Sequence, residues 1–314
     1  MSRRDVEPNE TGMLSVGEGH EVYWETWGNQ SGVPVVFVHG GPGGECVPGH
    51  REMFDPDRYH VVFFDQRGCG RSRPLASDPD ADLSANTTHH LIRDMEMIRE
   101  HVGVARWAVY GLSWGTTLGL AYAEAHPERV IGVMLGLVGL TTKREVTWIT
   151  EGVARIFAPQ WERFSSFVPP ELTHLPLVDA YAEMLFDPDP ETRAAAADEW
   201  CIWEDTHMGL APGAGPRLQG EDPAYKLRFA RLVTHYWSNA AFLGETQLLD
   251  NASVLDGIPG VLVHGRYDVS SPIETPWLLA RAWDGAELVV VDDAGHGGGS
   301  LVDAFVAGLD KVTT

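Results

Sequence analysis

The stretch Gly111-Leu112-Ser113-Trp114-Gly115 decides the fold. It follows residues 107–110, an apolar run that predicts a short buried strand, and it precedes residues 116–123, whose pattern predicts a helix. A Gly-x-Ser-x-Gly sequence between a strand and a helix predicts a sharp turn whose flanking positions favour glycine. Such a turn lifts the serine hydroxyl above the sheet edge, at the positive end of the helix. Because five residues also match by chance, an ordinary Gly/Ser turn stays the alternative until the rest of the chain is considered.

Strands and helices alternate on both sides of this turn. Residues 91–102 carry apolar side chains at helical spacing, and several runs rich in β-branched and aromatic residues have the length of buried strands. This alternation predicts a mostly parallel sheet with right-handed crossovers. The expected strands are residues 22–27, 35–38, 61–64, 107–110, 130–138, 260–264 and 288–291.

The alternation stops near Leu140 and resumes at residue 260. Residues 141–247 are rich in Trp, Phe, Glu and Ala, show helical patterns, and contain Pro-rich joints. A helical insertion between two parts of one sheet predicts a cap over the carboxyl edge of the sheet, with a cleft beneath it. We therefore expect a core formed by residues 1–140 and 248–314, and a helical cap formed by residues 141–247.

Composition narrows the possible partners. The 314 residues include 45 acidic and 23 basic side chains, a net charge of −22. Such a surface repels phosphate backbones, so we expect no nucleic-acid partner. The same field favours a cationic ligand, although solubility alone also explains it.

The cysteines and the apolar runs indicate the cellular compartment of the protein. Cys46, Cys69 and Cys201 form no C-x-x-C pair, which argues against a disulfide scaffold and a zinc cluster. The N-terminus shows no apolar signal-peptide segment. The longest apolar run, residues 130–140, is shorter than the roughly 20 residues that span a bilayer. We expect a cytoplasmic protein with no membrane partner, and no oligomeric state is indicated.

A reactive serine needs a base, a group that orients the base, and donors for the oxyanion. The α/β-hydrolase fold supplies them in the order Ser, acid, His, from loops at strand ends. Asp268 follows the expected strand 260–264, and His296 follows the expected strand 288–291. The fold class is therefore predicted to be an α/β-hydrolase with a helical cap, with Ser113, Asp268 and His296 as a catalytic triad.

Other candidates for these roles fit less well. Some hydrolases carry the acid one strand earlier, but residues 139–142 contain no carboxylate. Asp292 and Asp293 lie too close to His296 in sequence to reach its far nitrogen easily. No H-E-x-x-H motif is present, and neither a metal nor an organic cofactor is expected.

Glycine-rich and charged loops follow the first two parallel strands. His39-Gly40-Gly41-Pro42-Gly43-Gly44 occupies the position of an oxyanion loop, so the amides of Gly41 and Trp114 are the expected oxyanion donors. His39 is expected to brace this loop. The carboxylate and the two arginines of residues 65–72 could be taken for a catalytic cluster. We interpret this segment as a buried ion-paired turn in which Cys69 is an unreactive packing residue.

These segments together resemble the proline iminopeptidases of the α/β-hydrolase superfamily, over nearly the whole chain. The resemblance implies release of an N-terminal residue, usually proline, with carboxylates of the cap binding the free α-amine; Glu204 matches the first of these. An α-amine with a pKa near 7.7–8.0 is mostly cationic at neutral pH, so an anionic partner suits it. The matching segments are residues 22–25, 27–29, 39–44, 65–73, 86–88, 111–116, 156–157, 161–164, 200, 203–204 and 265–268.

The substrate-binding positions depart from the family pattern. Val233 stands where the family usually has a second glutamate, and Gly139 and Thr150 replace two aromatic residues. Trp237, in the same segment as Val233, is also expected at the pocket. Gly297 follows the histidine where the family commonly has serine. Loss of an anion and of aromatic bulk suggests a ligand that is larger and less cationic than an N-terminal proline.

The resulting prediction is a serine hydrolase that cleaves an amide bond through an acyl-enzyme and releases an N-terminal proline or another small or apolar residue. The alternative is an amide or ester hydrolase acting on a non-peptide metabolite. A catalytically silent binding protein on the same scaffold is a third hypothesis. The expected partner is a small peptide or a small-molecule amide or ester.

Overall fold

An eight-stranded sheet forms the centre of the computed structural model, which describes residues 6–78, 80–210 and 215–314. The strand order is β1-β2-β4-β3-β5-β6-β7-β8. Strand β2 pairs antiparallel with both β1 and β4, and every later pair is parallel. The strands are β1 (Glu10–Gly17), β2 (His20–Gly28), β3 (Val33–Val38), β4 (Tyr59–Phe64), β5 (Trp107–Leu112), β6 (Val130–Gly136), β7 (Gly260–Gly265) and β8 (Ala286–Val291).

Helices cover both faces of the sheet, which explains why the central strands are continuous apolar runs. Helices α1 (Thr88–His101), α2 (Trp114–Ala125) and α9 (Glu274–Ala282) contribute to one apolar cluster, and α10 (Leu301–Val312) contributes to a second one. All six residues of β4 are buried. Short 3-10 helices lie at Pro48–Met53, Pro127–Arg129, Gly152–Arg155, Pro170–Leu172, Leu218–Gly220, Ala240–Phe242 and Ala252–Leu255.

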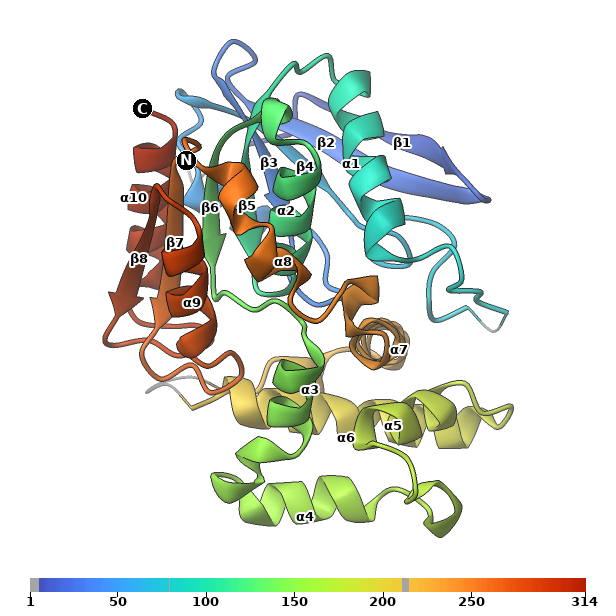
Figure 1. The fold of residues 1–314 in the computed structure, drawn as a ribbon. Coiled ribbons are helices and arrows are strands. Elements are labelled where there is room, and N and C mark those ends of the chain that lie inside the picture. Colours follow the sequence, from blue (N-terminus) through green and yellow to red (C-terminus); the bar gives the residue numbers. More distant parts are fainter. Residues whose placement is uncertain (1–5, 79, 211–214) are drawn as a thin grey trace.

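A group of helices lies beyond the carboxyl ends of the parallel strands (Figure 1). These helices lie between β6 and β7 in the sequence, and their apolar side chains join the cluster on the α1/α2 face. Ser113, Asp268 and His296 follow β5, β7 and β8, so they lie at the edge of the sheet that faces this cap. Its helices are α3 (Lys143–Thr150), α4 (Ala158–Ser166), α5 (Leu177–Leu185), α6 (Pro190–Met208) and α7 (Pro223–Ser238); α8 (Gln247–Asp250) leads back to the core.

The α/β-hydrolase architecture predicted from sequence is confirmed, with two differences in detail. Strand β1 was not expected, because its residues are mostly exposed at the edge of the sheet and carry little apolar signal. The strand expected over residues 130–138 ends at Gly136. It ends there because Leu137 adopts a positive φ of 60°, which turns the chain away from the sheet.

Candidate active site

Ser113 stands on a tight turn between β5 and α2. Its backbone has φ 54° and ψ −124°, a conformation that a residue with a side chain rarely adopts. The turn brings three backbone segments so close that side chains do not fit at its glycines. A Cβ at Gly111 would collide with the carbonyl oxygen of Gly115, and a Cβ at Gly115 with that of Val38. The Gly-x-Ser-x-Gly sequence therefore reflects the geometry of this turn.

A continuous chain of hydrogen bonds joins three side chains from different loops. Ser113 Oγ lies 2.9 Å from Nε2 of His296, and Nδ1 of His296 lies 2.8 Å from Oδ2 of Asp268. With its proton on Nδ1 and donated to the carboxylate, the imidazole presents an unprotonated Nε2 to the serine hydroxyl. This is the arrangement that a general base requires.

The surroundings of Asp268 keep its carboxyl group ionised. Its second oxygen accepts hydrogen bonds from the backbone amides of Ser270 and Ser271, each at 3.0 Å. Burial alone would raise the pKa of Asp268, but the charge and hydrogen bond of His296, together with His264 and the Ser271 amide, lower it. His264 links the neighbouring loops: its Nδ1 accepts from the Val138 amide at 3.1 Å, and its Nε2 donates to the Ser271 carbonyl at 2.7 Å.

The glycine loop after β3 lies against the nucleophile, where a Cβ at Gly40 would be 3.2 Å from Cβ of Ser113. His39 braces this loop, as expected: Nδ1 donates to the Gly40 carbonyl at 2.8 Å, and Nε2 accepts from the Gln66 amide at 3.1 Å. Burial lowers the pKa of His39, which keeps the ring neutral. Gly41 and Trp114 both line the cavity beside Ser113.

Gln66 connects the two sides of the expected oxyanion hole, a role that sequence reasoning missed. Its Nε2 donates to the His39 carbonyl at 3.0 Å, and its Oε1 accepts from the indole Nε1 of Trp114 at 2.8 Å. The Trp114 amide is in the first turn of α2 and has no intrahelical acceptor. Within the described residues, the Gly41 amide also has no backbone acceptor. Both amides are therefore free to bind an oxyanion.

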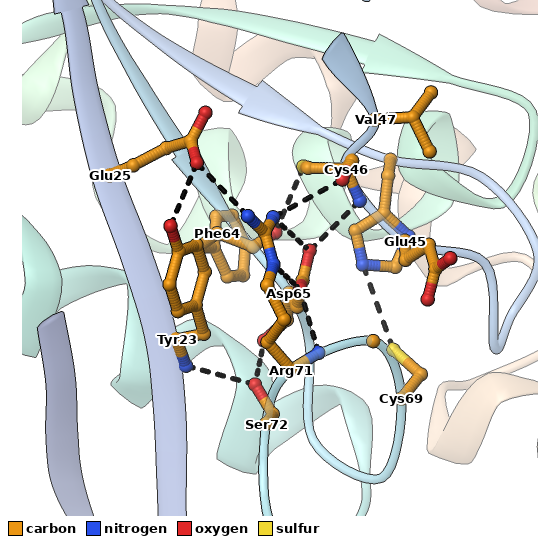
Figure 2. Close-up of polar contacts among 12 residues, drawn as sticks. Tyr23, Glu25, Glu45, Cys46, Val47, Phe64, Asp65, Cys69, Arg71 and Ser72 are labelled. Atoms are coloured by element: carbon orange, nitrogen blue, oxygen red, sulfur yellow. Dashed lines mark hydrogen bonds and ion pairs between the residues drawn. The ribbon is translucent and has the colours of Figure 1, made fainter. Parts of the chain in front are cut away.

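The charged loop after β4 is an ion-paired turn, as interpreted from sequence, in which Asp65 and Arg67 are buried and Arg71 is exposed. Figure 2 shows Arg71 between the carboxylates of Asp65 and Glu25, at 2.7 Å and 3.0 Å, and over the ring of Tyr23. Asp65 also accepts the backbone amide of Cys46 at 2.8 Å, so the turn holds the chain that follows the glycine loop. Burial raises the pKa of the Cys69 thiol well above its usual range, so this cysteine stays protonated.

A cavity of about 420 Å³ opens above Ser113, between the sheet edge and the cap. Three predicted substrate-binding residues line it: Glu204 of α6, Gly139 after β6, and Trp237 of α7. The other two do not. Thr150 is buried and donates its hydroxyl to the Val146 carbonyl at 2.8 Å, and Val233 is fully buried in the apolar cluster. Thr150 and Val233 therefore contribute to the packing of α3 and α7 and do not line the cavity.

Glu204 is the buried carboxylate of the cavity wall, only 4% exposed. Its Oε1 accepts the indole N–H of Trp200 at 3.1 Å, and its Oε2 lies 3.3 Å from Nε2 of His207. Nδ1 of His207 lies 2.8 Å from the hydroxyl of Ser270, two residues after Asp268. The carboxylate is therefore held by the indole of Trp200 and linked through His207 to the loop that carries Asp268.

Comparison with known proteins agrees with this geometry. The family model described as the alpha/beta hydrolase fold matches residues 33–298. A probable proline iminopeptidase of Streptomyces coelicolor is 46% identical over 98% of this chain and 96% of its own length. The proline iminopeptidase of Neisseria meningitidis serogroup A is 42% identical over 98% of this chain and 97% of its own. The chain belongs to the proline iminopeptidase family.

Membership of the proline iminopeptidase family makes this chain a hydrolase, as predicted. A crystal structure of the Mycobacterium smegmatis proline iminopeptidase has the same fold, with a TM-score of 0.59 at 19% identity over 96% of this chain and 97% of that one. Within the residues that the structure describes, no helix is long and apolar enough to cross a bilayer. The same residues contain no group of three or more His, Cys, Asp or Glu side chains placed to hold a metal ion.

Proposed function

We propose that this chain releases the N-terminal residue of small peptides by acyl transfer to Ser113. The observation that carries the proposal is the hydrogen-bonded series Ser113–His296–Asp268, with spacings of 2.9 Å and 2.8 Å, at the base of a cavity. Three free, buried cysteines suit a reducing compartment, and we place the protein in the cytoplasm.

In the first half-reaction, Ser113 attacks the carbonyl carbon while His296 takes the hydroxyl proton. Asp268 holds the imidazole in the correct tautomer and stabilises its charged form. The amides of Gly41 and Trp114 stabilise the oxyanion, and each such donor contributes about 3–4 kcal/mol in comparable sites. His296 then passes its proton to the leaving nitrogen, and a water molecule hydrolyses the acyl-enzyme by the same route.

Glu204 is the proposed partner of the substrate α-amine. A buried carboxylate benefits from a cationic partner because it has lost most of its hydration. Its neighbour His207 and Trp237 of α7 line the same cavity, so a small apolar side chain beside the amine would contact aromatic rings. This arrangement supports N-terminal proline or alanine as the released residue.

A second candidate is hydrolysis of an amide or ester whose acyl part carries no free amine. It is favoured by Val233, because this fully buried apolar side chain adds no second carboxylate to the cavity. It is also favoured by Gly139, which lines the cavity without contributing an aromatic side chain to it.

One comparison separates the two candidates. Proline and alanine arylamides are assayed with free and with acetylated α-amines, on the wild-type protein and on the Glu204→Gln variant. The proposal expects turnover of the free amines, and Glu204→Gln should raise their KM sharply. Faster hydrolysis of the blocked amines, unchanged by Glu204→Gln, would favour the second candidate. A complete lack of activity that persists with both sets would contradict both.

A further inference from the structure

An arginine without an acidic partner lies at the mouth of the catalytic cavity. Arg217 is exposed and lines the cavity together with Ser113 and His296. Among the described residues, no carboxylate lies within ion-pair distance of its guanidinium. Four glutamates line the same cavity: Glu45, Glu145, Glu204 and Glu221. Glu45 is already paired with Arg228 at 2.9 Å, and Glu221 lies beyond ion-pair distance of Arg217.

The backbone of this arginine is fixed by a buried carboxylate. Asp205 is 6% exposed and accepts hydrogen bonds from the amides of Arg217 at 2.8 Å, Leu218 at 3.0 Å and Gln219 at 2.9 Å. Charge-assisted bonds of this kind are among the stronger ones in proteins. Asp205 directly follows Glu204 on α6. One turn of helix therefore carries the carboxylate proposed to bind the amine and the clamp that holds Arg217.

The guanidinium packs on the backbone immediately after the catalytic histidine. A Cβ added at Gly297 would collide with Nη2 of Arg217. Gly297 thus leaves the space that this side chain uses, and a serine at this position would fill it. The absence of a side chain at residue 297 brings the positive charge next to His296.

The mechanism of a serine hydrolase places the leaving group beside the catalytic histidine. In acyl transfer by a serine, the histidine that has taken the hydroxyl proton delivers it to the leaving nitrogen, so the leaving group must lie beside the imidazole. Arg217 lines the same cavity as Ser113, and its guanidinium lies beside the backbone that follows His296, which puts its charge on the histidine side of the cavity. Guanidinium groups bind carboxylates through two parallel hydrogen bonds.

We propose that Arg217 forms a subsite for a carboxylate on the leaving group, so that the preferred substrates are short peptides, dipeptides above all, whose leaving residue has a free carboxylate. The inference rests on the proposed function, because it needs acyl transfer to Ser113. The C–N bond breaks as the acyl–oxygen bond forms on Ser113, and the hydroxyl proton passes through His296 to the leaving nitrogen. The amino acid then departs with its carboxylate on Arg217.

The test compares L-prolyl-L-leucine with L-prolyl-L-leucinamide, which differ in the charge of the leaving group. The wild-type protein should favour the free carboxylate in kcat/KM by roughly threefold to tenfold, the range of an ion pair that is partly exposed. Arg217→Gln should bring the ratio close to one, and Arg217→Glu should invert it. Arg155→Gln removes the same charge from an exposed cap residue outside the cavity, and it should keep the wild-type ratio.

A second pair separates this inference from the proposed function. 4-Acetoxybenzoate and 4-acetoxybenzamide carry no amine on the acyl side, so their ratio reports on the leaving group alone. If both pairs are hydrolysed and Arg217→Gln leaves both ratios unchanged, the subsite is disproved while the hydrolase function stands. If neither pair is hydrolysed, the proposed function and the subsite fall together.

Discussion

Ser113 and His296 depend on the groups behind them. The imidazole can accept the serine proton only if its own proton stays on Nδ1, and the 2.8 Å bond to Asp268 fixes it there. Two backbone amides hold the other carboxylate oxygen, and the lowered pKa of Asp268 keeps it charged as the pH falls. Replacing the carboxylate of Asp268 by an amide would therefore change the tautomer of His296 without changing the shape of the site.

Replacing Asp268 by asparagine tests this dependence. Asp268→Asn should lower kcat by about 10⁴, because the amide N–H₂ would favour the tautomer with the proton on Nε2. KM for an arylamide substrate should change little. Asp292→Asn is the matched control, since Asp292 lies in the loop after β8 and pairs with Arg266 at the surface. Comparable kcat losses in the two variants would contradict the proposed role of Asp268.

At the level of single residues, the sequence was enough to predict those site residues whose role depends on their order along the chain. Ser113, Asp268 and His296 could be named because each follows a predicted strand in the order that the fold requires. Gln66 and Arg217 could not be named, because their roles arise from contacts between loops that no local pattern encodes. The resemblance pointed to Thr150 as a pocket residue, but it could not show that the side chain of Thr150 turns back onto its own helix.

Helix α7 illustrates how the cap is held on the core. Asn86, which precedes α1, accepts the hydroxyl of Tyr236 at 2.6 Å and donates to the Arg67 carbonyl at 3.0 Å. Its carbonyl lies 2.8 Å from Nε2 of His235. Tyr236 in turn packs its ring 4.5 Å from that of Trp114, the residue after the nucleophile. The position of the cap helix and the start of α2 are therefore coupled.

A double-mutant cycle measures this coupling. Asn86→Ala and Tyr236→Phe should each lower the free energy of unfolding by about 1–3 kcal/mol, because each leaves a buried polar group without its partner. The double variant should lose less than the sum of the two, by about 1 kcal/mol. Urea denaturation gives these values, and Tyr267→Phe, at an exposed tyrosine, should have almost no effect. Simple additivity of the two changes would show that the contact does not dock the cap.

Helix α2 also carries a carboxyl group whose ionisation opposes folding. Burial raises the pKa of Glu124 to about 8. In the unfolded chain a glutamate titrates near 4.3. Because the folded state favours the protonated form, this group's contribution to stability is complete below about pH 4.3, declines as the pH rises, and is lost above about pH 8.

Glu124→Gln should therefore stabilise the protein at alkaline pH. The variant's Tm should match that of the wild-type protein near pH 4.5 and exceed it by an increasing margin up to pH 8–9, where the margin becomes constant. Thermal melts across this range provide the measurement, with Glu151→Gln at an exposed position as the control. A difference in Tm between the variant and the wild-type protein that is the same at every pH would contradict the raised pKa of Glu124.

The boundaries of strands could be predicted from local sequence where the strand is buried along its whole length. The prediction was wrong where contacts with distant parts of the chain decide the boundary. The central strands were predictable because both of their faces are covered, which makes them continuous apolar runs. Strand β1 was not, because it is an exposed edge that exists through pairing with β2. The end of β6 was missed because no local pattern encodes the positive φ of Leu137, after which the Val138 amide donates to Nδ1 of His264, 126 residues away.

The whole molecule is strongly anionic, and this field acts on the approach of the substrate. A net charge of −22 attracts a cationic α-amine toward a cavity that contains Glu204, and it repels a free carboxylate. The unpaired Arg217 at the mouth would offset this repulsion locally. The overall negative charge therefore attracts the α-amine of a zwitterionic substrate, and Arg217 attracts its carboxylate.

Salt dependence separates the contribution of the field from that of contacts inside the cavity. Raising the ionic strength from 0.01 M to 0.5 M shortens the screening length, so kcat/KM for a free-amine alanine arylamide should fall by roughly threefold to tenfold at pH 6.5. The acetylated arylamide, which is neutral, should show almost no change. Near pH 9.5 the α-amine is mostly uncharged, so the salt dependence of the free-amine substrate should disappear. If instead both substrates respond equally to salt at pH 6.5, the effect acts on the protein itself, and the anionic surface plays no part in capturing the amine.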